Sequence, residues 1–240
     1  MDMLGIPVVM AVILAGLATS LGLQWSRRRR AYQLAWTVAL FWGFVGTLAF
    51  VLSAALGGQV FLFRLYYLGG AVLIAPLLGV GSAYLLRTAV WARLLLGITV
   101  VSAAVAALGL WTTPLDPARL HAMGIAPGTQ LITAPLVIIP VVVGNSLGTI
   151  AVVGVALASV WRAVRTRAQS GQAWGNALIA AGTLLVAAAG SLARLGHGAG
   201  FWGTMTAGWV VVYFGVTVVS SAHARVHAEQ GGPLGQPGSA

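Results

Sequence analysis

The stretch LQWSRRRRAYQLAW (residues 23–36) places four consecutive arginines between two long apolar segments. The rest of the chain is poor in charge: 59% of its 240 residues are hydrophobic, only 7% are charged, and the mean hydropathy is +0.95. Soluble domains carry about 25% charged residues, so this chain could not cover its apolar side chains with a water-facing surface. The composition predicts an integral membrane protein surrounded by lipid bilayer.

Seven apolar runs follow one another along the chain, and each is long enough to cross about 30 Å of hydrocarbon as a helix. They cover residues 3–25, 31–56, 60–86, 90–111, 131–161, 174–195 and 201–221. Their continuous apolarity excludes the alternating pattern of a membrane β-barrel. We expect an all-α, polytopic bundle of seven transmembrane helices over residues 1–229, followed by a disordered cytoplasmic tail over residues 230–240 that is rich in Gly and Pro.

The positions of the arginines predict the orientation. If the four-arginine stretch lies in the cytoplasm, the alternation of seven spans brings most other arginines to the same side, namely Arg27, Arg28, Arg29, Arg30, Arg87, Arg93, Arg162, Arg165, Arg167 and Arg225. Only Arg64, Arg119 and Arg194 fall on the other side. Basic residues concentrate in cytoplasmic loops, so we expect the N-terminus outside and the C-terminus inside. In the first run the positive charge follows the apolar residues, unlike a cleaved signal peptide, and this run should be a retained helix.

The formal net charge of +10 does not indicate nucleic acid as a partner, because the arginines lie in short gaps between apolar runs. With no Cys, the chain has no disulfide and no thiolate metal site. All basic residues are Arg, and Ala and Gly are abundant, which is typical of a GC-rich bacterial genome. We therefore expect a multi-pass protein of a bacterial cytoplasmic membrane.

Two segments share the pairs AW and AL and the triplet GTL: AWTVALFWGFVGTL (residues 35–48) and AWGNALIAAGTL (residues 173–184). The match would pair runs one to three with runs five to seven and leave run four as a connector, a possible 3+1+3 internal repeat. Helices rich in small residues also produce such matches for packing reasons alone. Both interpretations stay open. The run 174–195 is the richest in small residues, and we expect it to pack tightly.

Ionisable groups inside the membrane usually mark ion paths and proton relays. Here the middle of the spans contains no Asp, Glu, Lys or His, which argues against a proton-coupled pump. The absence of Lys excludes a retinal Schiff base. The pattern GNSLG (residues 144–148) fits a nucleophile elbow, but it lies inside an expected helix without a nearby His. An enzyme is therefore the least favoured class.

Four residues are candidates for a ligand site. Arg64 and Tyr67 lie in FLFRLYY, where Arg64 either reaches the membrane surface or binds an anion in an outward-facing cavity. Asn145 follows Pro135 and Pro140 in the fifth run. It either forms a hydrogen bond that holds two helices together or binds a ligand. Tyr213 in the last run either lines a pocket or only packs against neighbouring side chains. We expect these four residues to line a cavity that opens outward between runs two, three, five and seven.

The leading functional hypothesis is binding or transport of a small uncharged or apolar ligand in that cavity. The rival is a non-catalytic scaffold or accessory subunit, with another membrane protein or a second copy of the chain as its partner. The third is a membrane enzyme. No cofactor and no metal are expected: His223 and His227 have the spacing of a ligand pair but lack further ligands. The pair His121 and His197 would be unusual haem ligands, because both lie outside the spans.

Two segments, RLYYLGGAVLIAPLLGVGSAYLL (residues 64–86) and NALIAAGTLLVAAAGSLARLG (residues 176–196), resemble parts of seven-helix membrane proteins of GC-rich bacteria. The resemblance covers about a fifth of the chain and is carried by Tyr-x-x-Gly and Gly-Thr-Leu patterns. It implies the seven-helix fold and no particular activity.

Overall fold

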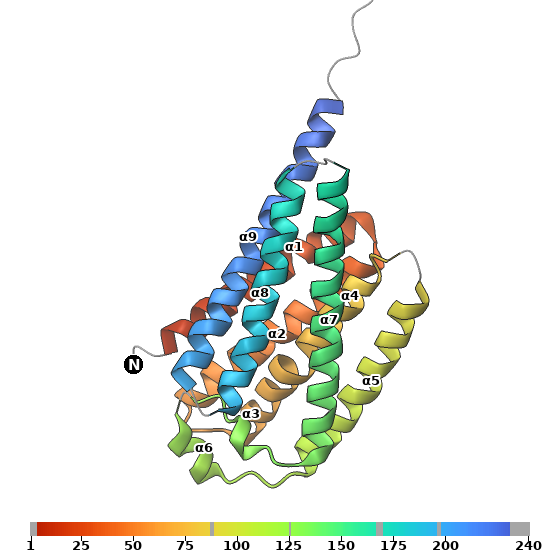
Figure 1. Cartoon of the computed structure of the whole chain (residues 1–240). Helices are drawn as coiled ribbons and strands as arrows, with labels where there is room; N and C mark the ends of the chain where they lie inside the picture. Colours follow the sequence, from red (N-terminus) through yellow and green to blue (C-terminus); the bar gives the residue numbers. More distant parts are fainter. Residues whose placement is uncertain (1–3, 87–88, 125, 167–169, 196–197, 231–240) are drawn as a thin grey trace, which may run out of the picture.

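The described residues contain seven helices that are long and apolar enough to cross a membrane, as the sequence predicts (Figure 1). The structure, a computed structural model, describes residues 4–86, 89–124, 126–166, 170–195 and 198–230. All regular elements in these residues are helical. The spans are α1 (Gly5–Arg28), α2 (Ala31–Ala55), the continuous segment of α3 (Val60–Tyr66), η2 (Tyr67–Leu73) and α4 (Ile74–Ala83), α5 (Ala89–Thr112), α7 (Pro135–Arg165), α8 (Ser170–Arg194) and α9 (Gly198–Gln230).

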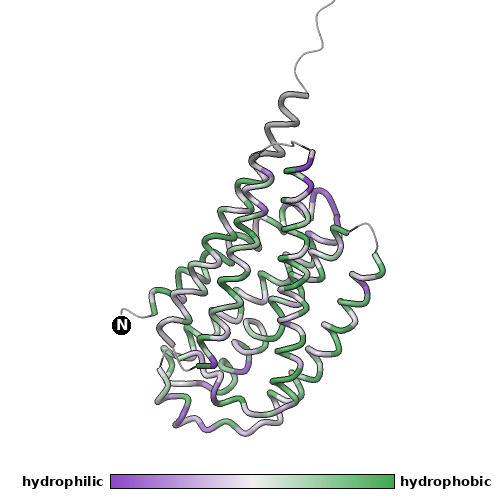
Figure 2. The backbone as a smooth tube through the Cα atoms, in the orientation of Figure 1, coloured by the Kyte–Doolittle hydropathy of each residue, from purple (hydrophilic) through white to green (hydrophobic). Residues whose placement is uncertain are grey.

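The connections between spans gather at two ends of the bundle. The arginine end, as we call it, holds Arg27–Arg30 where α1 ends and α2 begins, Arg93 near the start of α5, and Arg162 and Arg165 in the last turn of α7. The opposite end holds Arg64, Arg119 and Arg194, and we call it the α6 end. Figure 2 shows hydrophobic residues along the bundle and hydrophilic ones gathered toward its ends. Arg87, Arg167 and residues 231–240 lie outside the described residues, and which end faces the cytoplasm stays a prediction.

The spans pack in a ring. Helix α2 contacts α1 on one side and the α3–η2–α4 segment on the other, α4 contacts α7, α7 contacts α8, α8 contacts α9, and α9 returns to α1. Helix α5 lies outside this ring against α4, η2 and α7. Figure 1 shows α5 at one edge of the molecule. Consecutive spans are therefore mostly neighbours, as expected for short connections.

Glycines allow the closest helix contacts. A Cβ atom added to Gly79 of α4 would lie 2.6 Å from the Cα of Gly148 on α7. On α8 and α9, a Cβ at Gly182 would lie 2.7 Å from the Gly208 carbonyl oxygen. Membrane helices approach through small residues because lipid gives no hydrophobic drive between helices, so that van der Waals packing must hold them. The small residues of α8 are only partly buried: Gly182, Ala189 and Ala193 are buried, whereas Ala181 and Gly190 are exposed.

The third span changes its winding in the middle of the membrane. Residues Tyr67–Leu73 form a π-helix between the α-helical segments α3 and α4. Gly69 and Gly70 lie in this segment, and Pro76 follows in α4 without a backbone N–H. Single π-turns inside helices occur frequently at functional sites, which makes this segment a candidate functional site.

The long connection between α5 and α7 contains the short helix α6 (Pro117–Met123) and the 3₁₀ turn η3 (Thr129–Leu131). Asp116 caps α6 by accepting a hydrogen bond from the Ala118 N–H at 2.9 Å, and Pro117 occupies the first turn. Leu120 is buried against the bundle. The Tyr66 hydroxyl donates to the Pro127 carbonyl at 3.2 Å, and the Thr129 hydroxyl donates to the Ala193 carbonyl at 3.0 Å. These contacts hold the connection across the end of the bundle.

Candidate functional site

Asn145 on α7 meets the π-helical segment in the interior. Its side-chain amide Nδ2 donates a hydrogen bond to the Ala71 carbonyl at 3.1 Å. In a π-helix a carbonyl accepts from the N–H five residues later, which for Ala71 is the position of Pro76, and proline has no N–H to give. Asn145 therefore donates to the Ala71 carbonyl, which cannot receive the i+5 hydrogen bond of a π-helix because residue 76 is proline.

The same bond leaves the other half of the Asn145 side chain unused. The Ala71 carbonyl can only accept, so the Asn145 NH₂ group must face it and the Oδ1 atom must point elsewhere. Oδ1 is buried and has no hydrogen-bond partner. Buried polar atoms are almost always paired with protein, water or a bound group. Oδ1 is thus a free acceptor in the interior of the bundle.

Two further polar groups lie on α9, about as far from the start of their helix as Asn145 is from the start of α7. With a rise of 1.5 Å per residue, Asn145 lies about 15 Å along α7 from Pro135. Thr206 and Trp209 lie about 12 and 17 Å along α9 from Gly198. Both helices start at the α6 end and both contact α8. The Thr206 hydroxyl and the Trp209 Nε1 atom are also buried and without a partner.

Arg64 lies near the α6 end, in α3. Its Nη2 atom donates to the Thr113 carbonyl at 3.0 Å, just beyond the end of α5. The partial negative charge at a helix C-terminus favours such a cation. The Arg64 Nε atom is buried without a partner. Arg64 therefore acts first as a cap on α5, and its Nε–H has no partner.

Tyr67 is 2% exposed and packs in an aromatic cluster at the α6 end. Its ring centroid lies 6.2 Å from that of Phe63 and 6.4 Å from that of Tyr66. The cluster continues through Phe50 to Trp202 on α9, with ring centroids 4.4 Å apart. Rings at these separations and tilts attract one another, so they tie α2, α3 and α9 together.

Of the four residues predicted to line a ligand site, the structure brings three to the third span. Arg64 and Tyr67 lie on it, and Asn145 is hydrogen-bonded to Ala71 in the same π-helical segment as Tyr67. Tyr213 is 45% exposed on α9, where its ring lies 6.1 Å from that of Phe214. In this structure it does not join the others.

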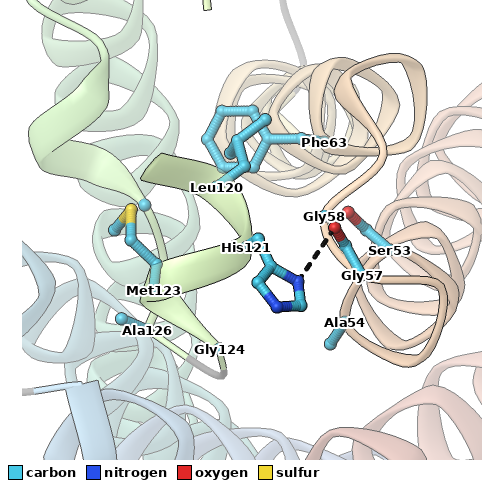
Figure 3. A pocket seen from close by; sticks show the side chains of 11 residues that line it. Ser53, Ala54, Gly57, Gly58, Phe63, Leu120, His121, Met123, Gly124 and Ala126 are labelled. Atoms are coloured by element: carbon cyan, nitrogen blue, oxygen red, sulfur yellow. Dashed lines mark hydrogen bonds between the residues drawn. The ribbon is translucent and has the colours of Figure 1, made fainter. Parts of the chain in front are cut away.

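The α6 end also holds a pocket that the sequence does not reveal (Figure 3). Its volume is about 240 Å³. It lies between the α2–α3 turn and α6, and His121 from α6 projects toward that turn. One sequence feature indicates the helix α6 that lines the pocket. It is Asp116-Pro117, a pair typical of a helix start, inside a segment otherwise expected to be a loop.

No metal site is formed by the part of the chain that the structure describes, where no three His, Asp or Glu residues come together. His197 lies outside the described residues, as do the side chains of His223 and His227. Comparison with family models, with curated proteins and with solved structures finds no match to this chain. Function must be inferred from the site itself.

Proposed function

We propose that this protein binds, or carries across the membrane, a small uncharged and largely apolar ligand at the π-helical segment of its third span. The observation that carries the proposal is the buried Asn145 Oδ1 atom, which has no partner beside a helix that departs from α-geometry. The segment Tyr67–Leu73 and the facing turn of α7 are the elements of the site.

The chemistry of the site favours one class of ligand. Oδ1 accepts hydrogen bonds and cannot donate, so the ligand presents a hydroxyl or N–H group to it. The neighbouring interior is apolar, with Val72 and Ile74 buried. A charged ligand would lose its hydration there without a counter-charge, because neither the third span nor α7 contains an acidic residue. Small alcohols, phenols and amides meet these conditions.

The test is a screen of such compounds by the thermal shift of the purified protein in detergent, followed by N145A. A compound bound at the proposed site raises the melting temperature of the wild-type chain and loses most of this effect in N145A. The matched control is N176A: Asn176 also donates from its side chain to a backbone carbonyl, that of Gln172 in its own helix, at 2.9 Å. N176A should keep the ligand response. If the compounds shift N145A as much as the wild-type chain, the site is wrong.

A second candidate function is that of a scaffold in a membrane complex, and one observation favours it. Ala187, Ala188 and Ser191 form a short exposed row of small residues over one turn of α8. Such a row suits close contact with another membrane helix. A188L tests this directly: a co-purifying partner should be lost in A188L and kept in A104L, at an exposed position of the peripheral helix α5.

The cellular setting belongs to the same proposal. The arginines of the arginine end support a position of that end in the cytoplasm and of the N-terminus outside. The composition supports a bacterial cytoplasmic membrane. The 3+1+3 repeat stays a prediction of the sequence pairs.

A further inference from the structure

We propose that the pocket at the α6 end is a second binding site, which takes a neutral single-ring molecule with one hydrogen-bond donor. The pocket is lined by residues of α2, the α2–α3 turn, α3, α6 and the connection from α6 to α7. The inference is independent of the site at Asn145, since no residue is shared.

The walls of the pocket are built from glycines in left-handed backbone conformations. The described residues contain four glycines with positive φ, at positions 57, 58, 124 and 128, and all four line this pocket. A Cβ atom at Gly58 would lie 2.7 Å from the His121 backbone N, and one at Gly128 would collide with the Phe63 ring. Only residues without a Cβ bring these backbones so close. The shape of the pocket thus depends on a specific backbone path.

The hydrogen bond of His121 determines what the pocket can recognise. The Nδ1 atom lies 3.2 Å from the Gly57 carbonyl oxygen (Figure 3). A carbonyl can only accept, so in the neutral ring Nδ1 carries the proton and Nε2 is left as an acceptor. Among the described residues, this is the only hydrogen bond of the His121 side chain. The pocket therefore offers one acceptor to a ligand that can donate.

The remaining lining side chains are mostly apolar: Phe63, Leu120 and Met123 are large, and Ala54 and Ala126 leave space. A volume of about 240 Å³ is below the range of about 300–1,000 Å³ typical of drug-sized ligands. It suits a single aromatic ring with a small substituent. Because no acidic or second basic side chain lines the pocket, the ligand should be neutral.

The experiment measures the reactivity of His121 with diethyl pyrocarbonate, which modifies unprotonated imidazole nitrogen, in the full chain in detergent. The probes are para-cresol, which has a hydroxyl donor, and para-methylanisole, which has the same ring but no donor. Mass spectrometry follows each of the four histidines separately, so His197, His223 and His227 report any general loss of reagent. We expect para-cresol to protect His121 selectively, at concentrations about five- to tenfold lower than para-methylanisole, because one hydrogen bond differs.

Two variants locate the site. A54L fills the space beside the α2–α3 turn and should remove the protection by para-cresol while His121 still reacts. A122L changes an exposed α6 residue outside the lining and should behave as the wild-type chain. A126L, on the other wall, replaces A54L if that variant melts at a lower temperature than the wild-type chain.

Three outcomes would overturn the proposal: equal protection by both probes, protection of all four histidines, or protection that survives filling of the pocket. N145A should leave the protection intact, which separates this site from the one inside the membrane.

Discussion

Gly148 is the residue whose smallness matters most for the contact between α4 and α7. A Cβ there would collide with the Ala75 carbonyl and lie 2.8 Å from the Pro76 nitrogen, and both are backbone atoms that cannot rotate away. We expect G148A to lower the free energy of unfolding by about 1–3 kcal/mol, as overpacked cores do.

The control for this prediction lies on the same helix. Gly154 of α7 has no atom within 4 Å of an added Cβ, so G154A should change stability by no more than about 0.5 kcal/mol. Unfolding in mixed detergent micelles, followed by circular dichroism, compares the two variants. Equal losses in both would mean that glycine stabilises α7 through its backbone and not through contact with α4.

Arg64 and Arg119 give a second matched pair. Arg64 donates to the Thr113 carbonyl from a partly buried position, and a hydrogen bond from a charged group contributes about 1.5–3 kcal/mol. Arg119 lies 3.8 Å from Asp116 with 76% of its side chain exposed, and such pairs contribute about 0–1 kcal/mol. R64M should therefore destabilise the protein clearly and R119M hardly at all in the same unfolding assay. A larger effect of R119M would show that the α5 cap does not stabilise the bundle.

The third span is the element with the most unusual construction, and it can be tested by a double-mutant cycle. P76A restores a backbone N–H to the position that should bond the Ala71 carbonyl. We expect N145A to cost about 1–2 kcal/mol in the wild-type background, where the hydrogen bond to this carbonyl is lost, and less in P76A, where the restored N–H can replace it. The coupling energy from unfolding of the four proteins measures this directly. Additive effects would show that Asn145 and Pro76 do not share the Ala71 carbonyl.

The elements themselves were largely predictable from sequence, for a physical reason. Lipid offers no hydrogen bonds to loose backbone, so an apolar run of sufficient length has to be helical. Small differences appear at ends: the fifth run begins as a helix at Pro135 and not at 131, because residues Thr129–Leu131 form a 3₁₀ turn and Pro135 takes the first helical turn. Helix α6 was missed because seven residues carry too little periodicity to stand out.

The partners of the candidate residues were not predictable. Arg64 and Asn145 stood out because polar groups are rare in these spans, but no pattern in one chain says that they bond Thr113 and Ala71. Tyr213 was placed near them because α9 is apolar on all sides, and then periodicity does not tell the interior face from the lipid face. The only indication of the π-helix in the sequence is the presence of Gly69, Gly70 and Pro76, which disfavour a regular α-helix.

At the scale of the whole molecule, the orientation is the prediction most easily tested, because the chain has no Cys. Single cysteines can be introduced at exposed positions, Ala122 on α6 and Ser26 near the arginine end. If the N-terminus is outside, a membrane-impermeant maleimide should label A122C in intact cells and S26C only after permeabilisation. The reverse pattern would contradict the positive-inside argument.

The π-helix has one more consequence, for how this molecule can move. Each residue in a helix advances the winding by about 100°, and a π-turn contains one residue more than an α-turn. If the surplus residue shifts along the segment, the stretch it passes rotates about its own axis while α3 and α4 keep their length and direction. Tyr67, at the first position of η2, could then turn out of the aromatic cluster without loosening the glycine contact of Gly79 with α7. A sliding defect of this kind would let the bundle change the side chains it presents to its interior without bending any helix.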